Sequence, residues 1–198
     1  MKPIVLIGCK GQLGQELKFI LEALGKREVI SFDRATFDLS QPKEIANKLQ
    51  ETQPSLIINA AAYTAVDKAE SEAELAYQIN AIAPSIIAQE AQKLGAFLIH
   101  YSTDYVFDGK QGYPYQETDR TSPQSVYGES KLKGEVVIQA NCDNHIIIRT
   151  AWVYGNYGKG NFVKTMLRLG KERKEIRVVT DQIGSPTWTK DLAETTVQ

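Results

Sequence analysis

Short apolar runs alternate with longer amphipathic stretches along this chain, and that alternation predicts its secondary structure. Between the runs, apolar residues recur every three or four positions, which is typical of helices with one buried face. The runs themselves are rich in Val, Ile, Leu and Phe and predict buried strands at residues 3–7, 28–32, 55–59, 96–102 and 145–149. The predicted helices span residues 12–24, 42–52, 70–94, 122–141 and 161–171.

Proline and serine positions refine the predicted helix boundaries. Pro84 is expected to break or bend the helix that contains it, because proline has no backbone N–H to donate. Ser122 followed by Pro123 fits the start of a helix. A short strand is expected at residues 177–179, and residues 189–198 have the pattern of the first turns of a helix.

The order of the predicted elements indicates the fold class. Strands that are apolar on both faces, each followed by a helix, predict a parallel sheet with helices on both sides. Right-handed crossovers between such strands give an α/β fold with a doubly wound sheet. Because ligands of these folds bind outside the carboxyl ends of the strands, functional residues are expected in five loops. These loops are residues 8–14, 33–39, 59–67, 102–114 and 150–160.

Composition narrows the class of protein. The 198 residues carry 23 Lys and Arg against 24 Asp and Glu, and because a broad nucleic-acid surface is normally basic, no nucleic-acid partner is expected. The apolar runs fall far short of the ~20 residues that cross a bilayer, and no secretory signal pattern opens the chain. We therefore expect a cytoplasmic protein with no membrane partner. Two Cys and two His are too few for a disulfide framework or a His-rich metal site, so no metal is predicted.

A glycine-rich segment joins the first predicted strand to the first predicted helix. Gly8, Gly11 and Gly14 follow a GxxGxxG spacing, with Gln12 and Leu13 between the last two. The first glycine permits a tight turn, the second lets backbone amides approach a pyrophosphate, and the third lets the helix pack on the strand. The helix N-terminus adds unpaired N–H groups and a positive dipole end. This context predicts a dinucleotide-binding loop.

Charged residues follow the second predicted strand. Asp33 is placed to accept hydrogen bonds from ribose hydroxyls of a dinucleotide, and Arg34 is placed to neutralise a 2′-phosphate. The pair therefore leaves both NADH and NADPH open. Asp38 and Leu39 fit a loop that touches the adenine.

Tyr127 and Lys131 lie four residues apart in a predicted helix, which places both on one face. A free tyrosine has a pKa of about 10, and a nearby ammonium is expected to lower that pKa by favouring the phenolate. Tyr127 would then be a better general acid or base near neutral pH. The fourth predicted strand ends in Ser102 and Thr103, and a hydroxyl at that strand end is expected to face the same crevice. A hydroxyl, a tyrosine and a lysine together can orient and protonate a carbonyl oxygen.

Longer stretches carry a more specific signal. They are GCKGQLGQEL (8–17), NAAAYTAVDKAE (59–70), HYSTDYVFDG (100–109), PYQETD (114–119), SPQSVYGESKLKGE (122–135), RTAWVYG (149–155), NFVKTML (161–167) and DQIGSPTWTKDLA (181–193). Through them the chain resembles the dTDP-4-dehydrorhamnose reductase family, a nucleotide-sugar branch of the extended short-chain dehydrogenase/reductases. The broader family shares only the glycine loop and the YxxxK spacing.

The resemblance implies roles for residues at matching positions. The catalytic set would be Thr103, Tyr127 and Lys131, with Tyr127 as the proton donor. The cofactor-binding set would be Gly8, Gly11, Gln12, Leu13, Gly14, Asp33, Arg34, Asp38, Leu39, Ala60, Ala61, Ala62, Tyr101, Tyr127 and Lys131. Thr103, Asp104 and Trp152 would contact the substrate, and Asn80 would support the catalytic lysine.

The resemblance also implies an activity. NADPH or NADH would reduce the 4-keto group of dTDP-4-dehydro-L-rhamnose, the last step in making dTDP-L-rhamnose. Two alternatives stay open: another nucleotide-sugar epimerase or dehydratase, and a cofactor-binding regulatory subunit of the methionine adenosyltransferase type. The presence of Thr103, Tyr127 and Lys131 together favours an enzyme.

Members of this family are longer than this chain, which bears on domain organisation. We expect residues 1–175 to form an NAD(P)-binding Rossmann domain. Residues 176–198 are then expected to begin a substrate-binding lobe that is truncated here. A homodimer is left open.

Overall fold

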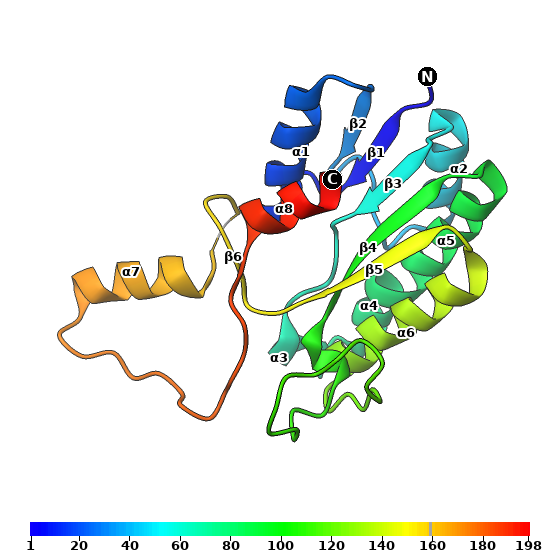
Figure 1. Ribbon diagram of the computed structural model, residues 1–198. Coiled ribbons are helices and arrows are strands. Elements are labelled where there is room, and N and C mark those ends of the chain that lie inside the picture. The colour runs from blue at the N-terminus through cyan, green and yellow to red at the C-terminus, as the bar shows by residue number, and fades with distance from the viewer. Residues whose placement is uncertain (159) are drawn as a thin grey trace.

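The computed structural model describes residues 1–158 and 160–198, which are built around a five-stranded parallel sheet (Figure 1). The strands are β1 (Ile4–Ile7), β2 (Val29–Phe32), β3 (Leu56–Asn59), β4 (Phe97–Thr103) and β5 (His145–Thr150). Their order in the sheet is β2-β1-β3-β4-β5. The predicted doubly wound sheet is confirmed, and the ends of the five predicted strands shift by at most one residue.

Helices cover both faces of the sheet because successive strand residues point to opposite sides. On one face, Val5 and Ile57 pack in a core with residues of α2 (Pro42–Thr52), α5 (Ala83–Leu94) and α6 (Val126–Asn141). On the other face, Leu6 and Ile58 pack against α1 (Gln12–Leu24) and α8 (Thr189–Val197). Figure 1 shows α8 lying beside α1 on this second face.

The predicted helix at 70–94 is divided in the structure. It contains α4 (Ala73–Tyr77), a wide-turn π segment (Gln78–Ile82) and α5, and the short α3 (Val66–Ala69) precedes them. Pro84 lies in the first turn of α5. Because it cannot donate to the carbonyl of Asn80, four residues earlier, the helix widens at this point instead of ending.

The start of α6 corrects one predicted boundary. Ser122 and Pro123 remain in the loop, and the helix begins at Val126. Ser125 is the N-cap instead, because its Oγ accepts a hydrogen bond from the Gly128 backbone N–H at 3.1 Å.

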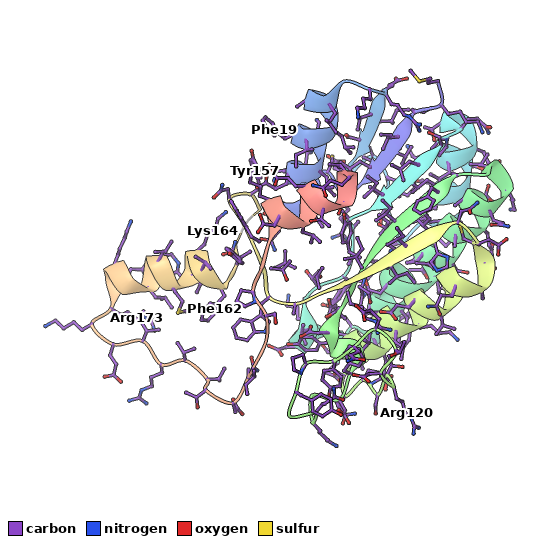
Figure 2. All side chains as sticks on the ribbon, in the orientation of Figure 1. Phe19, Arg120, Tyr157, Phe162, Lys164 and Arg173 are labelled. Atoms are coloured by element: carbon purple, nitrogen blue, oxygen red, sulfur yellow. The ribbon has the colours of Figure 1, made fainter. Side chains whose placement is uncertain are left out.

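The segment after β5 contains elements that the pattern did not reveal. These are the strands of a two-stranded parallel ribbon, which joins β6 (Val153–Tyr154) to β7 (Thr187–Trp188). The helix predicted at residues 161–171 is confirmed as α7 (Phe162–Glu172), which lies between them. The strand predicted at 177–179 is wrong, because those residues are described without any ladder partner. In Figures 1 and 2, α7 and the chain that follows it extend away from the sheet.

Two general features complete the fold. Within the part of the chain that the structure describes, no helix combines the length and apolar character needed to cross a membrane. The same residues include no group of three or more His, Cys, Asp or Glu side chains arranged to hold a metal ion.

Candidate active site

Thr103, Tyr127 and Lys131 are brought to one place by the packing of α6 on the end of β4. Thr103 is the last residue of β4, and the other two lie in the first two turns of α6. All three side chains are buried. Gly128 permits this approach, because a Cβ there would collide with the carbonyl of Tyr105. The structure therefore juxtaposes the three residues that the sequence singled out.

Burial controls the chemistry of Tyr127. It raises the pKa of the phenol above its usual value, a hydrogen bond with Thr103 opposes that rise, and the charge of Asp104 adds to it. The ring of Tyr105 packs edge-on against the Tyr127 ring, with the centroids 5.5 Å apart. The expectation that Lys131 lowers this pKa is therefore wrong for this structure: burial raises it, and the groups that act on the phenol are Thr103, Asp104 and Tyr105. A phenol held in its protonated form can donate a proton.

Lys131 lies at the bottom of the site and is only 2% exposed. Its Nζ donates a hydrogen bond to the carbonyl of Tyr101 at 2.6 Å. Burial lowers the pKa of Lys131 to about 8, and the charge of Glu135 opposes the shift. Glu135 is itself paired with Arg149, at 2.6 Å. Lys131 is therefore able to exchange a proton close to neutral pH.

Two buried residues that were not predicted from the sequence are linked to Lys131. His100 contacts the lysine directly, and Asn59 contacts His100. The Nε2 atom of His100 lies 3.4 Å from Lys131 Nζ, and the Nδ1 atom of His100 lies 3.1 Å from Asn59 Nδ2. Desolvation, followed by the charge of Lys131, lowers the pKa of His100 well below 6.5. Asn59 and His100 each sit inside an apolar strand, so only the pairing of β3 with β4 could have revealed them.

Asn80 has other partners than the expected one. Its Oδ1 accepts a hydrogen bond from the Tyr63 backbone N–H at 2.9 Å, and its Nδ2 donates to Tyr63 O at 3.1 Å and to Ser130 Oγ at 3.0 Å. Gly134 of α6 also packs on its carbonyl, which a Cβ would strike. Asn80 thus fixes α6 against the π segment.

The glycine loop has the geometry that a dinucleotide needs. Gly8 adopts φ +87°, and a Cβ there would meet the backbone of Ala60 and Ala61. A Cβ at Gly14 would collide with the Gly8 carbonyl, while Leu13 is buried in the core. This close approach joins the ends of β1 and β3, where the direction of the strand order reverses and ligands of doubly wound sheets bind. Ala62 follows directly after this contact.

Gln12 is bound to a neighbouring loop through both ends of its side-chain amide. Its Nε2 donates to the carbonyl of Val153 at 3.2 Å, and its Oε1 accepts from Asn161 Nδ2 at 3.4 Å. These two hydrogen bonds hold the glycine loop against β6 and against Asn161, which precedes α7.

Asp33 follows β2 directly, and both of its carboxylate oxygens already have partners. Its Oδ1 accepts hydrogen bonds from the backbone N–H groups of Ala35 and Thr36, both at 3.0 Å, and its Oδ2 is paired with Lys10. The hydrogen bond from Lys10, followed by that from Thr36, lowers the pKa of Asp33 to about 2. Arg34 is exposed beside it. Two cations therefore flank one carboxylate at the position expected to face the adenosine ribose.

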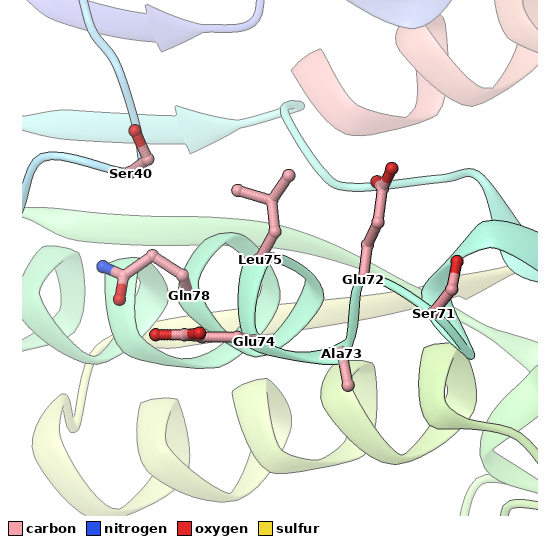
Figure 3. A pocket seen from close by; sticks show the side chains of 7 residues that line it. All are labelled: Ser40, Ser71, Glu72, Ala73, Glu74, Leu75 and Gln78. Carbon is pink, nitrogen blue, oxygen red and sulfur yellow. The ribbon is translucent and has the colours of Figure 1, made fainter.

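Asp38 and Leu39, the two residues predicted to lie beside the adenine, have different surroundings in the loop after Asp33. Asp38 Oδ1 accepts a hydrogen bond from the Ser40 backbone N–H at 2.9 Å. Leu39, in contrast, is buried in the core cluster of the sheet. Beyond Ser40 lies a depression against α4 whose lining residues are shown in Figure 3: Ser40, Ser71, Glu72, Ala73, Glu74, Leu75 and Gln78.

The remaining predicted residues have different surroundings. Tyr101 turns its ring into the core on the α1 side, where its hydroxyl lies 2.8 Å from Thr196 Oγ1; burial raises the pKa of Tyr101 to about 12. Its carbonyl, and not its ring, faces Lys131. Asp104 lies 3.2 Å from the Thr103 hydroxyl, and burial raises the pKa of Asp104. Trp152, at φ 47°, is 42% exposed.

The amino-acid sequence of this chain matches a family of known proteins over its whole length. The family model described as "RmlD substrate binding domain" matches residues 1–198. A curated dTDP-4-dehydrorhamnose reductase of Salmonella typhimurium is 50% identical over 98% of this chain, which spans 65% of that protein.

Solved structures agree. A dTDP-4-dehydrorhamnose reductase of Clostridium acetobutylicum superposes with a TM-score of 0.94 at 44% identity, covering 98% of this chain and 69% of that one. A dTDP-4-dehydrorhamnose reductase of Bacillus anthracis, solved in complex with NADP, superposes with a TM-score of 0.94 at 45% identity, covering 100% of this chain and 70% of that one. The chain therefore belongs to the RmlD substrate binding domain family, together with the dTDP-4-dehydrorhamnose reductases.

Proposed function

We propose that this protein is an NAD(P)H-dependent dTDP-4-dehydrorhamnose reductase, which reduces the 4-keto group of dTDP-4-dehydro-L-rhamnose to give dTDP-L-rhamnose. The observation that carries the proposal is the burial of Thr103 and Tyr127 side by side, with Lys131 one turn further along α6. The relatives support the choice of reaction and sugar.

The glycine loop fits a dinucleotide cofactor. Gly8 and Gly14 let the turn pack directly on the backbone of Ala60 and Ala61 and on the start of α1, and no side chain caps the N-terminus of α1, which leaves its first N–H groups for a phosphate. Lys10 and Arg34 beside Asp33 give the adenosine end cations that suit a 2′-phosphate. NADPH and NADH are both proposed as cofactors, and the bound dinucleotide would supply the hydride.

The protein's own residues would handle the oxygen and its proton. The Thr103 hydroxyl would donate a hydrogen bond to the keto oxygen, so that developing negative charge is stabilised. Tyr127 would donate its proton to the same oxygen, and the raised pKa of Tyr127 keeps that proton in place until charge develops. Lys131 would hold the ribose next to Tyr127. Proton transfer from a positioned side chain contributes typically 10²–10⁴-fold in rate.

The sugar would lie at the mouth of the crevice, between Asp104 and Trp152. Gly184 of the DQIGSPT stretch packs on the indole of Trp152, since a Cβ there would strike the ring. This contact brings two sequence-specific stretches of the family to one edge of the site. A cytoplasmic location is proposed on the nucleotide-sugar class of substrate alone.

Tyr127→Phe tests the proposal, because it removes a single hydroxyl and keeps the ring. NADPH and NADH oxidation would be followed at 340 nm with dTDP-4-dehydro-L-rhamnose, in the 198-residue chain and in a version extended at its C-terminus to the length of its relatives. Turnover should fall about 10²–10⁴-fold, while NADPH binding, measured by fluorescence titration, should be retained.

Tyr113→Phe is the matched control, since Tyr113 is 69% exposed in the loop before α6 and loses the same atom. Equal turnover by Tyr127→Phe and the unaltered protein would contradict the proposed acid. Tight NADPH binding without turnover in either form of the protein would instead support a regulatory cofactor-binding subunit.

A further inference from the structure

Asn59 and His100 form a buried polar pair between the central strands. They are directly opposite in the register of β3 and β4, and each is 1% exposed. Burying two polar side chains in an apolar sheet is unfavourable unless their hydrogen-bonding groups find partners. The partners here lead step by step to Lys131.

Backbone geometry fixes the orientation of the Asn59 amide. The N–H of Ala61 donates to Asn59 Oδ1 at 3.2 Å, so the oxygen faces the backbone and the Nδ2 group faces His100. Nδ2 carries only protons, which makes His100 Nδ1 the acceptor of that 3.1 Å contact. Because His100 is neutral, its single ring proton must then be on Nε2.

That proton is directed at Lys131. His100 Nε2 lies 3.4 Å from Lys131 Nζ, which also donates to the carbonyl of Tyr101. A neutral amine could accept the Nε2–H through its lone pair, whereas an ammonium would present a second donor to it. The other ionisable groups near this lysine are on α6: Glu135, paired with Arg149 of β5, and Tyr127.

We propose that Asn59 and His100 are positioning residues that hold the Lys131 amine in place and set how readily it gains and loses a proton. The pair acts through a chain of hydrogen bonds. The Ala61 backbone orients the Asn59 amide, and this amide selects the His100 tautomer that presents its Nε2–H to Lys131. The role extends the proposed function, because it concerns a residue of the proposed reductase site. Asn80, the expected support of Lys131, is instead occupied with Tyr63 and Ser130.

The histidine tautomer can be measured directly, without substrate. The chain has only two histidines, so ¹⁵N signals of the imidazoles can be assigned with His145→Gln. The expected result is a neutral His100 with its proton on Nε2. A proton on Nδ1 in the unaltered protein would overturn the proposal.

Asn59→Asp should reverse the direction of the hydrogen bonds between residue 59, His100 and Lys131 with almost no change in side-chain shape. The carboxylate still accepts from Ala61 but can no longer donate, so the ring proton of His100 should move to Nδ1. Nε2 then becomes an acceptor for the ammonium of Lys131. The midpoint of the Lys131 ¹³Cε titration, assigned with Lys131→Met, should rise by about one pH unit, a tenfold change in the protonation constant. In an active enzyme the alkaline limb of kcat should move with it.

Asn80→Asp is the matched control, because Asn80 is also 1% exposed and packs against the same helix. It should leave the Lys131 titration within a few tenths of a pH unit. Equal shifts in the two variants would mean that a buried charge alone acts, and no shift in Asn59→Asp would mean that the pair only packs; either result overturns the proposal. Because these signals need no turnover, they are independent of whether the reductase activity is found.

Discussion

Side-chain burial differs sharply between two regions of the molecule. One is the group of side chains around the carboxyl ends of β3 and β4, and the other is the arm of residues 151–188. At the strand ends, polar side chains such as His100, Thr103 and Lys131 are buried and bonded to neighbouring elements. Along the arm, α7 has no buried residue, and Leu167 and Ile183 are 65% and 99% exposed. The groups proposed to move a proton are therefore fixed by the core, whereas Trp152, proposed to contact the sugar, is carried on the exposed arm.

The two regions also differ in where their apolar side chains lie. The α7 helix is amphipathic, with Phe162, Val163 and Leu167 all exposed. In the strand region, by contrast, apolar residues lie in one continuous core on each face of the sheet. We expect substitutions to reveal this asymmetry as a difference in stability.

A pair of leucine truncations should give the largest difference. Leu98→Ala removes a fully buried side chain of β4 and should lower the free energy of unfolding by about 2–5 kcal/mol. Leu167→Ala removes the same atoms from the arm and should change it by about 0.5 kcal/mol or less. Urea unfolding followed by circular dichroism measures both. Comparable losses would show that α7 is packed in solution.

Lys131→Met should separate stability from function within the buried region. The pKa of Lys131 is about 8 in the folded protein, against 10.5 for a free lysine. Below pH 8 both states carry the proton, and the full cost of burying the charge falls on the folded state. Between pH 8 and 10.5 the unfolded state holds more protons, so stability rises with pH.

The methionine variant should therefore be more stable than the unaltered protein by about 3–4 kcal/mol at pH 7, because the pKa of Lys131 falls from 10.5 to about 8 and each pKa unit is worth about 1.4 kcal/mol. The gain should disappear above pH 10.5. Lys133→Met on the exposed side of α6 serves as the control and should show no such trend. A gain that persists unchanged at high pH would mean that packing, and not charge, is responsible.

Lys10→Ala should have the smallest effect and concerns the choice of cofactor. Without Lys10, Asp33 regains a free carboxylate oxygen for a ribose hydroxyl, and one cation near a 2′-phosphate is lost. The ratio of NADPH to NADH affinity should shift toward NADH by roughly two- to fivefold, the range of an exposed ion pair. Fluorescence titration with each dinucleotide measures it. Lys18→Ala, which breaks a pair with Glu22 on α1, should leave the ratio unchanged.

Local patterns predicted the parts of the molecule that depend on neighbours in sequence. The GxxGxxG spacing located the turn at Gly8 and the start of α1, and the YxxxK spacing placed Tyr127 and Lys131 on one helix. Ser125 was missed as the cap of α6 because Ser122-Pro123 carries an equally good local signal.

Features that depend on pairing between distant segments were not predictable from one chain. The contact of Asn59 with His100 joins residues 41 positions apart and arises only from the register of β3 with β4. The β6–β7 ribbon was missed for the same reason, since its strands are two residues each. The pKa of Tyr127 was predicted in the wrong direction because burial cannot be read from helical spacing.

The docking of α8 on α1 has a consequence for how the chain folds during synthesis. Sheet strands β1 to β5 and their crossover helices emerge in order, but Leu13, Leu17 and Leu21 of α1 share a core with Leu192 and Ala193 of α8. Contacts between segments so far apart in sequence form slowly, because a long loop must close first. A nascent chain on the ribosome can therefore pack α1 against the sheet, but the part of this core that α8 covers stays open until residues 189–197 have been made.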